Sequence, residues 1–250
     1  MLVQIEVTTR CNFECFYCVG RDMAQQDMTM ATFARIMAGL PAEVRSVSLQ
    51  GEGEPVLHRQ LWDMAAAVHD SGRTTYTITN GGYRPTDKLL TRLDMAFDRI
   101  GVSLDTLDLP DAERIGRQAP SQTLAVIEAL VDRLGASRVD VFSVDTGRGG
   151  PRQVRDYLRR HPDVRHIVQP LQRKDDYAKR YGLTALEPSG RRICAYLGSD
   201  QFRYYDVTGM EMPCCFIKDT RAYPGIETMR RRFAEGVVPT CCTGCRELRQ

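Results

Sequence analysis

The first two-thirds of the chain alternates between two apolar patterns, and this alternation constrains the fold more than any other feature. Short β-branched runs predict six strands, at residues 2–9, 44–50, 74–79, 99–104, 138–144 and 164–168. Helical patterns separate them, at residues 31–40, 61–70, 87–93, 123–134 and 153–160. Such alternation predicts a parallel sheet with right-handed crossovers, and six units are too few for a closed barrel. We therefore expect an α/β fold, a partial (β/α)6 TIM-like barrel.

Charge and composition exclude several classes of protein. The net charge is +2 over 250 residues with acids and bases interspersed, which argues against a nucleic-acid partner. The longest apolar runs are too short for a membrane span, and the first residues lack the features of a signal peptide. Nine cysteines without an export signal indicate a reducing compartment, where clustered thiols bind metal more often than they form disulfides. We therefore expect a cytoplasmic metalloprotein.

Polar loops follow the first four predicted strands. In barrels of this kind the chemistry lies in the loops at the carboxyl ends of the strands. A single glycine-rich loop is typical of a plain turn, but four such loops on one rim predict a site. The loops carry Cys11, Cys15 and Cys18, then LQGEGEP at 49–55, TNGG at 79–82 and SLD at 103–105.

The three clustered thiols match neither of the common cysteine sites. A structural zinc site takes four ligands, and disulfides need an even number of cysteines. Soft thiolates do suit an iron–sulfur cluster, and a set of three leaves one corner open for a group that is not protein.

The CxxxCxxC pattern directly after a first strand, with Tyr17 before the last cysteine, resembles the radical S-adenosylmethionine (SAM) superfamily. The resemblance extends over about residues 1–170. It implies that Cys11, Cys15 and Cys18 hold three irons of a 4Fe–4S cluster and that SAM chelates the fourth. It also implies reductive cleavage of SAM, hydrogen-atom abstraction from a substrate, and an external one-electron reductant such as flavodoxin or ferredoxin.

The same resemblance implies the residues that bind SAM. Gly53 and Glu54 belong to EGEP, which matches the family's usual Gly-Gly-Glu-Pro, and Glu54 would receive the amino group of SAM. Glu52 replaces the first glycine of that motif. The other implied contacts are Tyr17, through its backbone to adenine, Asn80, in a loop close to the cofactor, and Ser103 and Asp105, at the ribose.

Six further cysteines follow a charged stretch that begins after Gln172. Cys194, Gly209 and Cys214 reproduce the spacing that opens the auxiliary-cluster region of the SPASM and twitch families, and residues 201–205 and 210–212 predict a hairpin between them. We expect a barrel domain at 1–171 and a small twitch domain at 172–250. The resemblance implies a second 4Fe–4S cluster on Cys194, Cys214, Cys242 and Cys245, although zinc fits four cysteines equally well.

Three residues are candidates for catalysis. Cys215 and Cys241 each stand beside a predicted ligand and could exchange roles with it. Each could also be a buried apolar side chain or a donor of hydrogen atoms to a substrate radical. Arg148 follows the fifth strand and could bind substrate hydroxyls, take a proton or hold the SAM carboxylate, or be an ordinary loop residue.

The compact layout resembles the 2-deoxy-scyllo-inosamine dehydrogenases of natural-product biosynthesis. That resemblance implies a small sugar- or aminocyclitol-like substrate whose secondary alcohol is oxidised to a ketone, with the auxiliary cluster as electron acceptor. A radical epimerase with a cysteine donor is the first alternative. A ribosomal-peptide maturase is the second, although we expect no appended leader-binding domain before Leu2. A non-catalytic iron–sulfur module is the remaining one.

Overall fold

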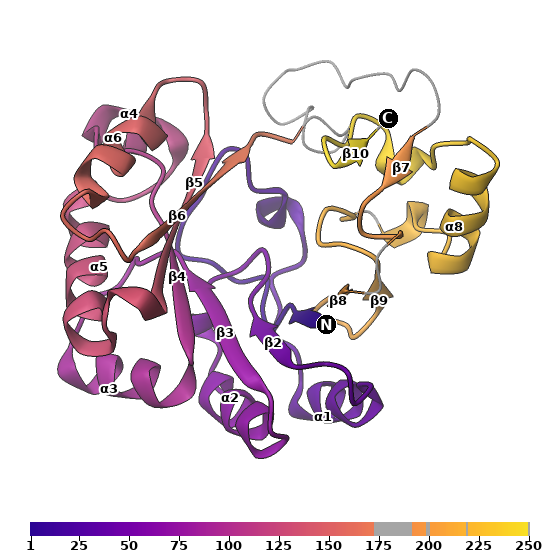
Figure 1. Cartoon of the computed structure of the whole chain (residues 1–250), viewed down its shortest axis with the longest axis horizontal. Helices are drawn as coiled ribbons and strands as arrows, with labels where there is room; N and C mark the ends of the chain where they lie inside the picture. The colour runs from indigo at the N-terminus through magenta and orange to yellow at the C-terminus, as the bar shows by residue number, and fades with distance from the viewer. Residues whose placement is uncertain (173–191, 199–200, 219, 250) are drawn as a thin grey trace.

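The structure is a computed structural model, and it describes residues 1–172, 192–198, 201–218 and 220–249. Six parallel strands lie side by side in the order β6-β5-β4-β3-β2-β1 (Figure 1). They are β1 (Leu2–Ile5), β2 (Ser46–Leu49), β3 (Thr74–Thr79), β4 (Arg99–Ser103), β5 (Val139–Asp145) and β6 (Arg165–Pro170). The predicted partial barrel is confirmed.

Helices cover the outer face of this sheet (Figure 1). The five predicted helices all form, with ends shifted by a few residues: α1 (Met30–Gly39), α2 (Leu61–Asp70), α3 (Asp87–Ala96), α5 (Pro120–Leu134) and α6 (Gly150–Leu158). Two begin at threonine caps, because the Thr29 and Thr86 side chains accept from backbone N–H groups of the first turn. The sequence did not predict the short helix α4 (Leu109–Ile115), which has a proline in its first turn and Gly116 at its C-cap.

Strand residues alternate between the helical layer and the barrel interior, as the period of a strand requires. On β1, Val3 and Ile5 are fully buried in the main core, whereas Gln4 lines the interior cavity. A buried carboxylate lies where strands β4, β5 and β6 begin. Asp140 is 0% exposed and pairs with Arg99 at 2.7 Å and Arg165 at 2.8 Å. These charges therefore lie at the amino ends of the strands.

The C-terminal part of the chain adds strands to the same sheet. The predicted hairpin forms as β8 (Phe202–Tyr205) and β9 (Glu211–Met212), and β8 also pairs in parallel with β1. The sheet therefore has eight strands, so the predicted second domain shares a sheet with the first. Its other elements are β7 (Ile193–Cys194), α8 (Ile226–Ala234) and β10 (Leu248–Arg249).

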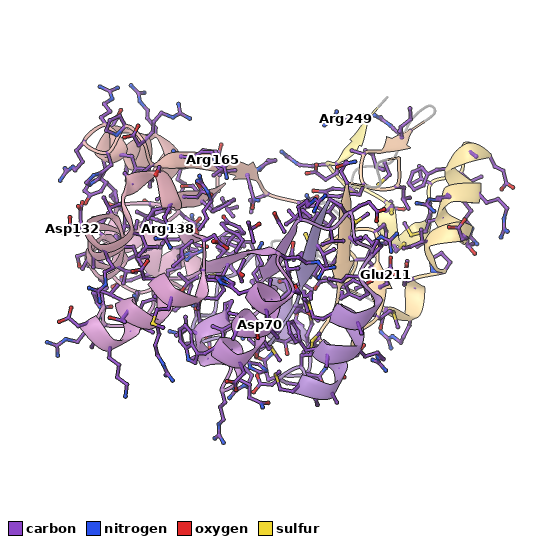
Figure 2. The ribbon with its side chains drawn as sticks, turned by 60° about the horizontal axis from the view of Figure 1, so that its bottom comes forward. Asp70, Asp132, Arg138, Arg165, Glu211 and Arg249 are labelled. Carbon is purple, nitrogen blue, oxygen red and sulfur yellow. The ribbon has the colours of Figure 1, made fainter. Side chains whose placement is uncertain are left out.

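Strand β8 belongs to two hydrophobic cores at once. Tyr205 packs in the main core, whereas Tyr204 packs in a second core with Cys194, Cys214 and Cys242. Figure 2 shows Glu211, on β9, in the C-terminal part, and Asp132 and Arg138 at the other end of the molecule. The charged stretch after Gln172 and the start of the predicted second domain fall on residues 173–191, outside the described residues. Within the described parts of the chain, no helix combines the length and apolar character needed to cross a membrane.

Candidate active site

A cavity of about 610 Å³ lies at the carboxyl ends of the parallel strands, where the sequence predicts the site. The structure brings most of the predicted residues together there. The cavity lining includes Cys11, Cys15, Cys18, Tyr17, Gly53, Glu54, Asn80, Ser103, Asp105 and Cys215. From the C-terminal part, Tyr196, Phe202, Phe216 and Glu247 complete the wall. The cavity thus lies between the barrel and the C-terminal part.

The loop that carries the three cysteines is anchored to the end of α4. The N–H of Glu14 donates to the carbonyl of Gly116 at 3.1 Å, and the N–H of Phe16 donates to that of Ile115 at 2.9 Å. Gly116 has a φ of +91°, and a Cβ there would lie 2.2 Å from the carbonyl oxygen of Glu14. A glycine is therefore required for the loop to approach the helix end.

Glu54 is a buried carboxylate held by neutral donors. It is 2% exposed, and it accepts from the Thr79 hydroxyl at 2.7 Å, the Asn80 N–H at 2.6 Å and the Val56 N–H at 3.2 Å. Burial raises the pKa of Glu54 to about 7, although these hydrogen bonds oppose the rise. A cation in the cavity, such as an ammonium group, would restore the ionised form.

Asp105, Tyr17 and Arg117 form a second buried group, of which the sequence missed Arg117. The Arg117 guanidinium lies 2.7 Å from Asp105 and donates to the Tyr17 hydroxyl at 2.8 Å, and that hydroxyl donates to Asp105 at 2.6 Å. Asp105 also accepts from the Val144 N–H at 2.7 Å. Despite burial, the neighbouring Asp105 carboxylate raises the pKa of Arg117, so the guanidinium stays charged. No sequence motif marks Arg117, because it follows α4 rather than a strand.

Two of the predicted SAM-binding residues, Asp105 and Tyr17, make side-chain contacts within the protein that the sequence did not predict. Asp105 is 2% exposed and both of its oxygens accept from protein donors, so its contact with the SAM ribose stays a prediction. Tyr17 contributes its hydroxyl to the Asp105 group, in addition to any backbone contact with adenine. Asn80 lies against the cysteine loop, where its amide donates to Asn12 at 2.8 Å and to the Cys11 sulfur at 3.4 Å.

Glu52 and Lys218 form a third buried group, which the sequence also missed. Lys218 Nζ lies 2.8 Å from one oxygen of Glu52, and the Cys18 sulfur lies 3.2 Å from the other. Burial opposes the ionisation of Glu52, but Lys218 lowers its pKa below the usual value. The neighbouring Gly53 packs so closely that a Cβ would lie 2.5 Å from the carbonyl oxygens of Thr8 and Arg10.

The C-terminal cysteines gather in the second core. Cys194, Cys214 and Cys242 are buried there, with Cys215 and Cys241 packed against them. Strand β7 pairs with β10, which brings Cys194 opposite Leu248, and the Cys245 N–H donates to the Cys242 carbonyl at 3.0 Å. Burial raises the pKa of the Cys194 thiol.

The three predicted catalytic residues are placed differently. Cys215 lines the cavity, whereas Cys241 and Arg148 are not among the residues that line it. Arg148 is 62% exposed and lies 3.9 Å from Asp111. Of these three residues, Cys215 therefore joins the predicted SAM-binding residues at the cavity. The catalytic roles of all three stay predictions.

All nine cysteines lie among the described residues, and none of them is in a disulfide. Among the residues that the structure describes, no group of three or more His, Cys, Asp or Glu is arranged to hold a metal ion. The metal-ligand assignments therefore stay predictions, as does the choice between zinc and iron–sulfur at the C-terminal cysteines. The donor set does fit a cluster at the first site, because three soft thiols there line one cavity with a carboxylate for a cationic cosubstrate.

Comparisons with known proteins agree with this fold. The chain aligns with Streptococcus suis SuiB bound to S-adenosylmethionine, with a TM-score of 0.66 at 14% identity over 88% of this chain and 61% of that one. It also aligns with BtrN in complex with AdoMet and 2-DOIA, with a TM-score of 0.53 at 16% identity over 94% of this chain and 87% of that one. At these identities the likeness concerns the fold alone.

Two curated relatives are each similar to about half of this chain. An S-adenosylmethionine-dependent nucleotide dehydratase of Selenomonas ruminantium is 31% identical over 42% of this chain and 39% of that protein. A GTP 3',8-cyclase of Marinobacter nauticus is 33% identical over 52% of this chain and 41% of that protein. The matched segments thus span about two-fifths of these relatives. The model of the Radical SAM superfamily matches residues 5–161, and the chain belongs to this superfamily, which implies SAM and a 4Fe–4S cluster.

Proposed function

We propose that this chain binds a 4Fe–4S cluster through Cys11, Cys15 and Cys18 and binds SAM beside it in the 610 Å³ cavity. The observation that carries the proposal is that one cavity collects these three thiols and the buried Glu54 from different loops. When bound, the cluster supplies the electron that cleaves SAM reductively. Glu54 would accept a hydrogen bond from the amino group of SAM, and Asn80 and Ser103 would line its binding site. The cavity walls would exclude water.

The reaction we propose is the oxidation of a secondary alcohol to a ketone. The substrate would lose a hydrogen atom from its carbinol carbon, a proton from its hydroxyl and one electron. The C-terminal cysteines Cys194, Cys214, Cys242 and Cys245 would hold the group that accepts this electron. What supports this reaction is the compact layout of the sequence, a barrel followed by a single set of cysteines, which resembles that of the 2-deoxy-scyllo-inosamine dehydrogenases. BtrN shares this fold over 94% of the chain.

The charges of the cavity support a small neutral or amine-bearing substrate. Among the described lining residues, the carboxylates are Glu52, Glu54, Asp105 and Glu247, whereas Arg117 is the one cationic side chain and is already paired with Asp105. A triphosphate would need several cationic side chains to replace its hydration. An amino sugar or aminocyclitol would need few cationic side chains.

The test is substrate-dependent cleavage of SAM by the anaerobically reconstituted protein with dithionite. The substrates compared are an aminocyclitol deuterated at its carbinol carbons, GTP deuterated at its ribose carbons, and a precursor-type peptide deuterated at its Cα and side-chain carbons. We expect deuterium in 5′-deoxyadenosine with the aminocyclitol alone, and one 5′-deoxyadenosine per ketone. A product of unchanged oxidation state would exclude dehydrogenation, and Cys15→Ala is the inactive control.

Two alternative reactions, chemistry on a nucleotide and epimerisation of a sugar, are each supported by a separate observation. Turnover of GTP would favour chemistry on a nucleotide, which the names of the curated relatives suggest. Epimerisation is the alternative for a sugar, and it is favoured by Cys215, a thiol in the cavity wall that could return a hydrogen atom. In deuterated water an epimerase of this kind would place solvent deuterium on the product carbon, and Cys215→Ala would abolish the product without preventing SAM cleavage.

A further inference from the structure

Lys218, from the C-terminal part of the chain, pairs with Glu52, which contacts the cysteine loop of the barrel. Lys218 Nζ lies 2.8 Å from Glu52 Oε1, and the two side chains are 3% and 16% exposed. The ammonium also lies 5.3 Å from the ring centre of Tyr204, which is itself buried. A lysine is rarely buried unless it is paired, so this contact is a specific feature of the fold.

The other oxygen of Glu52 lies against the cysteine loop. Glu52 Oε2 accepts from the Cys18 thiol at 3.2 Å and from the Gly20 N–H at 3.2 Å. There is no room for a side chain at Gly20, because a Cβ there would lie 2.4 Å from the Cβ of Glu52. Glu52 therefore bridges Lys218 and Cys18.

Glu6 fixes the backbone of Glu52 through a hydrogen bond. The Glu52 N–H donates to Glu6 Oε1 at 2.9 Å, and the Val207 N–H, from the C-terminal part, donates to Glu6 Oε2 at 3.3 Å. Glu6 is 0% exposed. The position of Glu52 is thus set by two contacts that cross between the barrel and the C-terminal part.

This arrangement matters once Cys18 becomes a ligand. A metal-bound cysteine is a thiolate and no longer donates its hydrogen, so two negative groups would face each other beside the cluster. An adjacent negative charge disfavours the addition of an electron to an iron–sulfur cluster, and an adjacent positive charge favours it. Lys218 lies where it can offset the charge of Glu52.

We propose that Lys218 and Glu52 are positioning residues that set the reduction potential of the cluster held by Cys11, Cys15 and Cys18. Glu52 fixes the loop around Cys18 and Gly20, and Lys218 balances its charge. The C-terminal part would thereby act on the cluster of the barrel through an ion pair. This inference rests on the cluster of the proposed function but not on the reaction that follows.

The test is the midpoint potential of the SAM-binding cluster, from redox titrations of the reconstituted full chain followed by electron paramagnetic resonance. The signal to follow is the one that changes when SAM is added. Glu52→Gln should shift the midpoint upward, because it removes the carboxylate. Lys218→Met should shift it downward, because it leaves the carboxylate unbalanced. Lys218→Arg should keep the wild-type value, and the double variant Glu52→Gln/Lys218→Met should lie between the two single variants.

Glu211→Gln is the matched control, since Glu211 pairs with Arg203 at 3.2 Å in the C-terminal part and should leave the midpoint unchanged. Iron content and thermal unfolding show that each variant is folded and loaded. Unmoved midpoints in both single variants, or shifts of the same sign, would overturn this inference alone. A wild-type protein with no SAM-responsive signal would overturn the proposed function as well.

Discussion

Glu54 and Asp105 are both buried carboxylates at the open end of the barrel, but the chain satisfies them differently. Asp105 has a cation of its own in Arg117, at 2.7 Å. Glu54 is held by the neutral donors of Thr79, Asn80 and Val56. A buried carboxylate held in this way favours a cationic ligand such as SAM, which supports our proposal that Glu54, and not Asp105, binds the amino group of SAM.

The affinity for SAM should therefore depend on pH. A hydrogen bond from the amino group of SAM requires the ionised form of Glu54, whose pKa in the free protein is raised to about 7. As the pH falls below that value, protonation of Glu54 should weaken the affinity by up to about tenfold per unit. Calorimetric titration of the reconstituted protein with SAM checks this. In Glu54→Gln the binding should be weak and independent of pH over the same range, and a wild-type affinity that improves on acidification would contradict the assignment.

Removal of Arg117 should be costly to stability. Arg117→Met leaves the nearly inaccessible Asp105 without its cation, and loss of one partner of a buried pair typically costs about 3–5 kcal/mol. Urea unfolding of the protein measures this loss. The double variant Arg117→Met/Asp105→Asn should recover part of it, because the uncompensated charge is gone. Equal losses in the single and double variants would show that Arg117 acts by packing and not by charge.

At the scale of elements, the cysteine loop depends on a helix that lies far away in the sequence. The loop follows β1, yet its backbone is held by the last residues of α4 through Ile115 and Gly116. The same helix end leads directly to Arg117. Helix α4 therefore positions both the loop and the cation beside it.

Gly116→Ala should disturb this contact more than an ordinary glycine substitution. Its Cβ would meet the Glu14 carbonyl oxygen at 2.2 Å, in addition to the strain of a positive φ. Gly72→Ala is the matched control, because Gly72 also has a positive φ, of +73°, but open space around it. The control should lose roughly 1 kcal/mol of unfolding free energy. Gly116→Ala should lose more and also retain less iron after reconstitution, whereas similar losses in the two variants would argue against the loop contact.

At the scale of the whole molecule, one sheet joins the main hydrophobic core to the second core, which contains Cys194, Cys214 and Cys242. Strand β8 adds the C-terminal part to β1, and Tyr204 and Tyr205 face different cores. Cys215 lines the cavity together with the cysteine loop and also packs against the core that contains the C-terminal cysteines.

Metal analysis should reveal two centres. If both are four-iron clusters, the reconstituted protein should contain about eight irons and eight sulfides. Replacement of Cys11, Cys15 and Cys18 by alanine should remove about half and abolish SAM cleavage. Replacement of Cys194 or Cys214 should remove the other half and leave SAM cleavage in part. Cys215→Ala and Cys241→Ala should keep the iron near its full value, and about four irons with one zinc would instead support a zinc site at the C-terminal cysteines.

The sequence by itself determined the elements and the family. Apolar periodicity is a local property, so it predicted the six parallel strands and five of their helices. The spacing of Cys11, Cys15 and Cys18 after the first strand predicted the superfamily, which the family model confirms. The order of parallel strands then placed the loops of Glu54, Asn80 and Asp105 on one rim.

Tertiary structure decided the contacts between residues that are distant in sequence. The pairing of β8 with β1 brings together residues about 200 positions apart, and no local pattern encodes it. The same holds for Arg117, whose partners come from the cysteine loop and from the loop after β4, and for Lys218, whose partner is Glu52. From the sequence, Glu52 is identified as a departure from the Gly-Gly-Glu-Pro motif. Its burial and its pairing with Lys218 are known from the structure. Burial and pairing depend on the packed chain, and this is why the partners of the charges around the cavity are known from the structure alone.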